Sequence, residues 1–286
     1  MTLRPRTLPV VAIALAAVAG CDTARSPDVD RALDPINVID DSNLNDIMLT
    51  AASPDEAVSY FRRSVREQPD RIDLRRGLAA SLVRAGRSTE AVPLWREIIA
   101  DDQMIEQDRI DYAGALIRTG EWDDAEAQLD MVPPTLETYE RYRLEAMVAD
   151  SNQEWDRADH FYETAVGLTT RPANVLNNWG YSRLTRGDFD GAGELFVEAI
   201  RYDPDLFTAK NNLVLARAAQ GNYQLPLVQL TEAERAQLLH TAALAAIRQG
   251  EADVGRGLLA EAIETHPQHF EAAVRALDAL ETEVRG

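Results

Sequence analysis

The chain has 286 residues, of which 45% are hydrophobic, enough to build a buried core. Its 48 acidic side chains outnumber the 29 basic ones, which gives a formal net charge of −19. So acidic a chain is repelled by nucleic acid and by anionic lipid headgroups, which argues against both as direct partners. The single cysteine, Cys21, excludes an internal disulfide.

The first twenty residues have the layout of a secretory signal peptide. Arg4 and Arg6 precede an apolar run over 8–18, which is too short to span a bilayer as a helix. The stretch 18–21, VAGC, resembles a bacterial lipobox. The resemblance implies cleavage before Cys21 and attachment of acyl chains such as palmitate, and several chains on one residue anchor a protein firmly. The alternative is an ordinary signal peptide with a chance cysteine.

Residues 21–37 are predicted to form an acidic flexible linker after the lipidated cysteine. The segment holds four aspartates, two prolines and few apolar residues, a composition that does not support a packed core. The predicted location is the bacterial cell envelope, anchored by lipid and facing the periplasm. Asp22 favours the inner membrane by the rule of enteric bacteria, but that rule is not general, so the inner and the outer membrane both stay open.

Beyond residue 38, three columns of residues recur at a spacing of 33 or 34. The first column is alanine, the second is bulky and the third is aromatic: Ala57, Ala91, Ala125, Ala158, Ala192; Phe61, Trp95, Leu129, Tyr162, Phe196; Trp122, Trp155, Phe189, Tyr223. A weaker column is glycine: Gly86, Gly120, Gly187, Gly221. A period of this length is typical of stacked helical units, which are usually binding surfaces.

The stretch 173–206 resembles a tetratricopeptide repeat. The signature residues are a bulky–small pair in the first helix, a glycine at the turn, a small and a bulky residue in the second helix, and a terminal proline: Trp179, Gly180, Gly187, Ala192, Phe196, Pro204. The resemblance implies an all-α, right-handed superhelical solenoid. Gly180 and Ala192 suit a close approach of the two helices, while Trp179 and Phe196 are expected to fill the space toward the next unit. Gly187 suits a positive φ, and Pro204 ends the second helix.

The same spacing places further units at 38–71, 72–105, 106–138, 139–172, 207–235 and 236–269, with a final helix over 270–284. The solenoid is therefore predicted to occupy residues 38–286, with about seven repeats and a C-terminal helix. The 207–235 unit is about five residues short. It carries Pro226 where the second helix should have alanine, so a kink or a break is predicted there.

The sequence shows no constellation typical of catalysis, metal binding or a cofactor, so a non-enzymatic protein is predicted. His266 and His269 are separated by Pro267 and have no cysteine or carboxylate partner at ligand spacing. Glycine-rich phosphate loops, nucleophile elbows and zincin motifs do not occur. In so acidic a chain, pairs of carboxylates are better explained as a solvated face.

The predicted functional site is a groove formed by the first helices of adjacent units. Asn177-Asn178 and Asn211-Asn212 stand at equivalent positions, 34 residues apart. The resemblance implies that the second asparagine of such a pair bonds the backbone of an extended peptide, for which an amide can both donate and accept. The predicted groove residues are Asn174, Asn177, Asn178, Tyr181, Asn211 and Asn212. The alternative is that these amides bond only to one another or to neighbouring backbone.

The polarity of this groove also bears on its partner. The two repeats offer asparagine and threonine rather than lysine or arginine, so a site for acidic tails is not predicted. A partner of basic character fits the overall charge better.

The stretch 177–272 resembles the TadD family of Flp/Tad pilus assembly lipoproteins. The likeness lies in a complete repeat followed by NNLVLARAAQGNY over 211–223 and LLHTAALAAIRQGEADVGRGLLAEAIETHPQ over 238–268. It implies a membrane-anchored, non-catalytic scaffold that binds subunits of a pilus or secretion machine, including its secretin channel. The alternative is an envelope adaptor for outer-membrane protein insertion or for cell-wall hydrolases.

Overall fold

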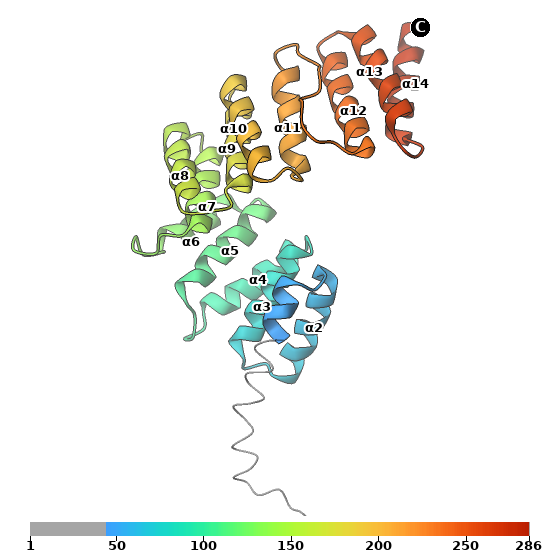
Figure 1. Cartoon of the computed structure of the whole chain (residues 1–286). Coiled ribbons are helices and arrows are strands. Elements are labelled where there is room, and N and C mark those ends of the chain that lie inside the picture. Colours follow the sequence, from blue (N-terminus) through green and yellow to red (C-terminus); the bar gives the residue numbers. More distant parts are fainter. Residues whose placement is uncertain (1–43, 286) are drawn as a thin grey trace, which may run out of the picture. The chain divides into compact units, whose positions relative to one another are not determined.

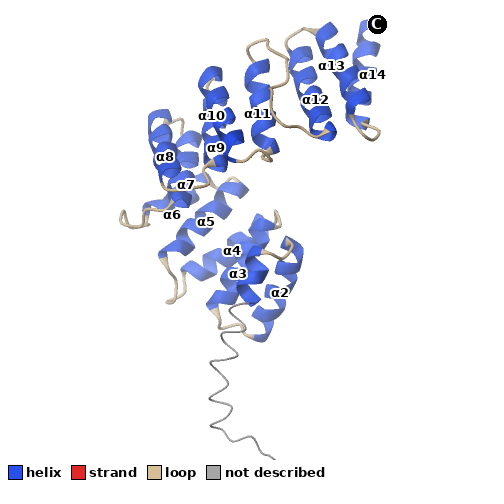
Figure 2. Cartoon of the chain, viewed as in Figure 1, coloured by secondary structure: helices blue, strands red, loops and turns tan. Residues whose placement is uncertain are grey.

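The computed structural model describes residues 44–285. The predicted signal peptide, Cys21 and the linker over 21–37 lie outside this range. The described residues fall into two units, 44–52 and 53–285. In the described part of the first unit, residues 44–50 are helical. Within 44–285 every regular element is a helix, as Figure 2 shows, and none of these helices has the length and apolar character needed to cross a bilayer.

The described part of the second unit holds thirteen helices, labelled in Figure 1. In chain order they are α2 (Pro54–Glu67), α3 (Ile72–Arg84), α4 (Ser88–Ile99), α5 (Glu106–Thr119), α6 (Trp122–Asp130), α7 (Tyr139–Ser151), α8 (Trp155–Gly167), α9 (Ala173–Thr185), α10 (Phe189–Tyr202), α11 (Phe207–Ala218), α12 (Glu232–Arg248), α13 (Ala252–Thr265) and α14 (Glu271–Arg285).

Each helix packs against its neighbours in chain order, and α3/α4, α5/α6, α7/α8, α9/α10 and α12/α13 form pairs. The first helices of adjacent pairs also touch one another, α3 with α5, α5 with α7, α7 with α9, and α9 with α11. Pairs that contact only their neighbours define a solenoid, so the predicted all-α solenoid is confirmed.

The repeating columns form the core. All five alanines of the first column are fully buried, and the bulky residues of the second column are at most 2% exposed. Gly180 shows why one position must be small: a Cβ built on it would lie 2.7 Å from the ring of Phe196. The glycine of α9 therefore leaves room for the ring of Phe196 from α10.

Phe196 and Trp179 face opposite neighbours. Phe196 shares a buried cluster with Leu213 of α11, as predicted for contact with the next unit. Trp179 stacks instead on Tyr162 of α8, with ring centroids 6.2 Å apart, so it fills the interface with the preceding unit. The expectation for Trp179 was therefore wrong. Its indole N–H donates a hydrogen bond to the carboxylate of Asp159 in α8, which holds the ring on the side of the preceding unit.

The turn that follows the first helix of a repeat uses a residue with left-handed backbone conformation. Gly86, Gly120, Gly187, Gly221 and Gly250 all have positive φ, between 72° and 87°. The same turn between α7 and α8 is made by Gln153, the one non-glycine residue of the described part with positive φ, at 61°. Gln153 stands at the position where the glycine column lacks a glycine. The positive φ is therefore kept at this turn although the residue type is not.

The 207–235 unit has a first helix, α11, but no second one. Residues 219–231 are not helical, and Pro226 lies buried within them. Proline lacks the N–H that a helix interior requires, which explains the loss. The segment packs Leu225 and Val228 against neighbouring cores, and α11 contacts α12 directly, so the stack continues past the missing helix. A capping box between Thr231 and Glu234 starts α12 at residue 232, four residues before the predicted unit boundary.

Candidate functional site

Two adjoining pockets lie along the first helices of the central repeats. The smaller, of about 460 Å³, is called the aromatic pocket and is lined by Trp122, Met147, Asp150, Ser151, Trp155, Tyr162, Asn177, Asn178, Tyr181, Ser182, Thr185, Thr208 and Asn212. The larger, of about 1000 Å³, is called the arginine pocket and is lined by Gly114, Ile117, Arg118, Tyr139, Arg143, Leu144, Met147, Thr169, Thr170, Arg171, Ala173, Asn174, Val175, Asn178, Tyr202 and Asp203. Met147 and Asn178 line both, so the two pockets form one groove.

The aromatic pocket combines flat apolar surfaces with amides. Trp122 and Trp155 are the first residues of α6 and α8, where the aromatic column of the sequence places them. Tyr181 of α9 is 53% exposed. Exposed aromatic rings beside amide groups are the surface that an extended peptide needs for its side chains and its backbone.

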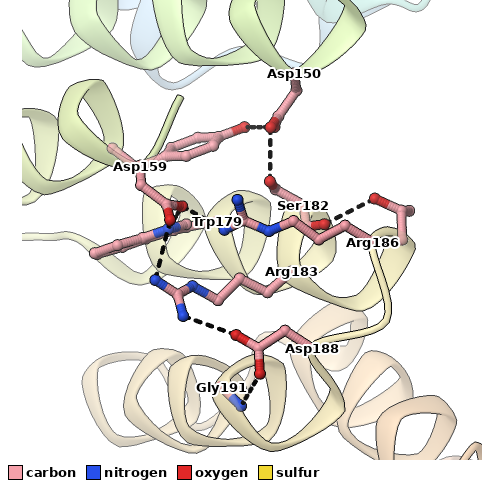
Figure 3. Close-up of polar contacts among 10 residues, drawn as sticks. Asp150, Asp159, Trp179, Ser182, Arg183, Arg186, Asp188 and Gly191 are labelled. Carbon is pink, nitrogen blue, oxygen red and sulfur yellow. Dashed lines mark hydrogen bonds and ion pairs between the residues drawn. The ribbon is translucent and has the colours of Figure 1, made fainter. Parts of the chain in front are cut away.

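A network of polar side chains fixes the position of α9 (Figure 3). Asp150 of α7 accepts hydrogen bonds from Ser182 at 2.6 Å and from the hydroxyl of Tyr162 at 2.8 Å. Burial raises the pKa of Asp150, and these two hydrogen bonds partly offset the rise. The bonds join α7, α8 and α9, and all three side chains belong to residues that line the aromatic pocket.

The same network continues through Asp159 of α8. Its carboxylate accepts from Trp179 at 2.5 Å and pairs with Arg186 at 2.5 Å and Arg183 at 3.1 Å. Arg183 also pairs with Asp188 at 2.7 Å, and Asp188 caps α10 by accepting from the backbone N–H of Gly191 (Figure 3). Each carboxylate has its donors, so this network holds the helices in place rather than offering a free acid or base.

The asparagines predicted from the sequence fall into two groups. Asn174 and Asn178 line the groove, and most of the hydrogen-bonding capacity of their side-chain amides is unused. Asn174 is exposed, and the amide nitrogen of Asn178 lies 3.7 Å from the sulfur of Met147. Asn177 instead accepts a 3.0 Å hydrogen bond from Asn212, which is buried. Asn211 accepts from Thr241 at 2.8 Å and lines neither pocket.

The groove therefore brings together Asn174, Asn177, Asn178, Tyr181 and Asn212, but not Asn211. Mutual pairing of amides, the alternative left open by the sequence, describes Asn177 and Asn212. Asn178 is the central polar residue, since it lies where the two pockets join.

Sequence reasoning missed three arginines of the groove: Arg118, Arg143 and Arg171. The expectation of an asparagine- and threonine-lined wall rests on α9 and α11 alone, whereas the arginines come from α5, α7 and the α8–α9 connection. The signal was present in the sequence, because Arg143 stands one period of 34 residues before Asn177.

The other titratable side chains of the described residues do not form a metal-binding cluster. Residues 44–285 contain no group of three or more side chains that could hold a metal ion. His266 and His269 have separate partners: the ring of His266 lies 2.8 Å from the carbonyl oxygen of Gln268, and that of His269 lies 3.0 Å from Glu271.

Comparison with known protein families agrees with the paired-helix architecture described above. A profile of the tetratricopeptide repeat family matches residues 49–105 and 177–230. Residues 49–105 and 177–230 are tetratricopeptide repeats. Tetratricopeptide repeats are scaffolds for protein–protein interaction, and their known ligands are proteins and peptides. No curated protein matches the chain.

Three solved structures illustrate the shared fold. The anaphase-promoting complex hetero-tetramer Cut9–Hcn1 gives a TM-score of 0.60 at 17% identity, over 88% of this chain and 52% of that chain. The chain thus spans about half the length of that relative. A tetratricopeptide repeat protein from Parabacteroides merdae gives 0.52 at 13% identity, over 90% and 100% of the two chains. TTC0263 from Thermus thermophilus gives 0.52 at 16% identity, over 61% and 95%. At such identities the likeness concerns the fold alone.

Proposed function

We propose that this tetratricopeptide repeat protein is a non-catalytic scaffold whose groove holds an extended segment of a partner protein. The observation that carries the proposal is the junction of the two pockets at Asn178. A peptide backbone presents alternating donors and acceptors, and an amide with spare capacity can serve both. The rings of Trp122, Trp155 and Tyr181 would accept apolar side chains of the same segment.

We further propose that the scaffold works in the bacterial cell envelope, tethered by acyl chains on Cys21. The support is the sequence VAGC over 18–21, together with the two arginines and the apolar run that precede it. Tethering confines the groove to a surface, which raises its effective concentration for partners at the same membrane.

The proposed process is assembly of a pilus or secretion machine of the Flp/Tad type. Its support is the resemblance of residues 177–272 to the TadD family. This stretch contains α11 and the part of α9 from Asn177 onward, so the resemblance covers about half of the residues that line the aromatic pocket. The competing role is an adaptor for outer-membrane protein insertion or for cell-wall hydrolases.

Site-specific photo-crosslinking in the native host tests the proposal. A benzoyl-phenylalanine at Tyr181, which is exposed in the aromatic pocket, is expected to capture a secretin or another pilus subunit. The matched control carries the same group at Val254 of α13, which is 40% exposed and lines neither pocket. Capture of hydrolases or of the insertion machinery at position 181 would contradict the pilus role. Identical capture at both positions would contradict the groove.

A further inference from the structure

The arginine pocket concentrates positive charge in an acidic chain. Arg118 lies in the last turn of α5, Arg143 in the middle of α7, and Arg171 in the connection between α8 and α9. All three line one pocket of about 1000 Å³, in which Asp203 is the single carboxylate-bearing lining residue. The whole chain, by contrast, carries a net charge of −19.

These three guanidinium groups have no carboxylate partner among residues 44–285. The Nη1 atom of Arg143 contacts only the sulfur of Met147, at 3.5 Å. Arg141 of the same helix shows the contrast, because it pairs with Glu145 at 2.8 Å and donates to the carbonyl oxygen of Pro133. Thirteen arginines of the described part form ion pairs with carboxylates, whereas these three, which share one pocket, form none.

Placing these cations together has an electrostatic cost. Burial lowers the pKa of Arg143, and the positive charge of Arg118 lowers it further, while Glu140 and Tyr139 act in the opposite direction. A bound anion would relieve this repulsion, and guanidinium groups bind carboxylates through paired, charge-assisted hydrogen bonds.

We infer that the arginine pocket binds acidic side chains of the peptide segment that occupies the groove. The inference rests on the proposed function, since the pocket joins the aromatic pocket at Met147 and Asn178. Side chains rather than one terminal carboxylate are favoured, because one carboxylate is satisfied by one guanidinium and three elements each supply one. The rest of the acidic surface repels acidic segments, so the pocket selects where such a segment binds.

The exposed tyrosines of the pocket fit the same ligand. Tyr139 is 36% exposed and Tyr202 is 55% exposed. Their rings can cover the methylene groups of Glu side chains while the carboxylates reach the arginines. The chemical class of partner is thus a segment that alternates aromatic or apolar residues with Asp or Glu.

Peptide display tests this inference on the full chain held in detergent. A library of random twelve-residue peptides, displayed inside a loop so that no free C-terminus exists, is selected on the protein and sequenced. We expect the selected peptides to be enriched in Asp and Glu. The Arg118→Gln, Arg143→Gln, Arg171→Gln triple variant is expected to lose this enrichment while it still selects apolar residues. Arg201→Gln, an exposed arginine outside the groove, is the matched control and should behave as the wild type.

Fluorescence anisotropy on one selected peptide measures how much the arginines contribute to its affinity. Replacing its Glu residues with Gln, or using the single Arg143→Gln variant, should weaken binding about tenfold or more, and less so as salt is added. The single variant keeps the test valid if circular dichroism shows that the triple variant is unfolded.

Three outcomes would overturn the inference. Enrichment of Lys and Arg, or of neutral peptides whose binding Asn178→Ala abolishes, would preserve the groove but refute its preference for acidic side chains. Binding only by peptides with a free C-terminus, in a parallel library displayed that way, would show that a terminal carboxylate is the ligand. Selection of no peptide by either library would contradict the proposed function and this inference together.

Discussion

The side-chain amide of Asn212 donates a 3.0 Å hydrogen bond to the amide oxygen of Asn177, which ties α11 to α9 along the groove. Asn212 is only 7% exposed, so its polar group depends on this bond. Asn178, one residue further along α9, has no comparable bond within 44–285. Neighbouring asparagines with the same sequence signature thus differ in their hydrogen bonding, and we predict different roles for them.

Substitution should separate these roles. Asn212→Ala leaves the Asn177 oxygen without its donor and is expected to lower the free energy of unfolding by about 1–2 kcal/mol. Asn178→Ala is expected to change stability by less than about 0.5 kcal/mol but to weaken peptide binding. Urea titration and anisotropy on both variants measure the two effects. A large stability loss in Asn178→Ala would show that this amide is structural too.

The turn at Gln153 predicts a stabilising substitution. A non-glycine residue with φ of 61° is strained by about 1 kcal/mol relative to glycine, and the five equivalent turns of the described part use glycine. Gln153→Gly is therefore expected to raise the unfolding free energy by up to about 1 kcal/mol. The reciprocal control, Gly187→Gln, should lower it by a similar amount. If urea titration showed Gln153→Gly to be destabilising, the relief of strain would be smaller than the entropy that glycine adds to the unfolded chain.

The approach of Gly180 to Phe196 predicts a steric clash. A Cβ at position 180 would lie 2.7 Å and 2.9 Å from two ring carbons, and the ring is fully buried. Gly180→Ala is expected to cost about 1–3 kcal/mol through overpacking.

A double-mutant cycle identifies the ring as the cause. Phe196→Leu alone leaves a cavity and is destabilising, but in the Gly180→Ala background it should cost less, because the smaller side chain leaves room for the methyl group. Additive losses in thermal and urea unfolding would place the clash elsewhere.

The fold was predictable from the sequence because its core positions repeat. The alanine and bulky columns fix helix packing locally, so each unit could be located from Ala192 and Phe196 without tertiary information. The missing helix after α11 was predicted only as a kink or a break, since one proline does not tell how far the disruption extends.

The site was less predictable because its residues come from several repeats. Asn178 and Tyr181 were found from their place on α9, whereas the arginines required knowing that α5, α7 and the α8–α9 connection border the same pocket. The pairing of Asn177 with Asn212 depends on a side-chain geometry that equal spacing does not determine.

Asp111 of α5 predicts a pH-dependent contribution to stability. Desolvation by the surrounding protein raises its pKa from 3.8 to about 6, and the charges of Asp108 and Glu140 add to the rise, while Gln107 and Arg76 lower it. Because the folded state holds this proton more tightly, the contribution of Asp111 stabilises the fold at low pH and is lost as pH rises from about 4 to 6. The residue keeps an exposed surface, so solvent screening reduces the size of the effect.

Asp111→Asn should therefore gain stability relative to the wild type at pH 7 but not at pH 4. Urea titrations at both values measure the difference, with Glu163→Gln on exposed α8 surface as the control. A difference between variant and wild type that is the same at both pH values would contradict the raised pKa.

The lipid anchor predicts that Cys21→Ala abolishes acylation. The substitution removes the only sulfhydryl in the chain, so an alkyne analogue of palmitate fed to the expressing bacteria should label the wild type and leave the variant unlabelled. Asn178→Ala, altered only in the groove, serves as the control and should be labelled like the wild type. After high-salt washing, the wild type should remain with the membranes, because several acyl chains hold a protein independently of charge. Equal labelling of Cys21→Ala, or release of the wild type by salt, would refute the anchor.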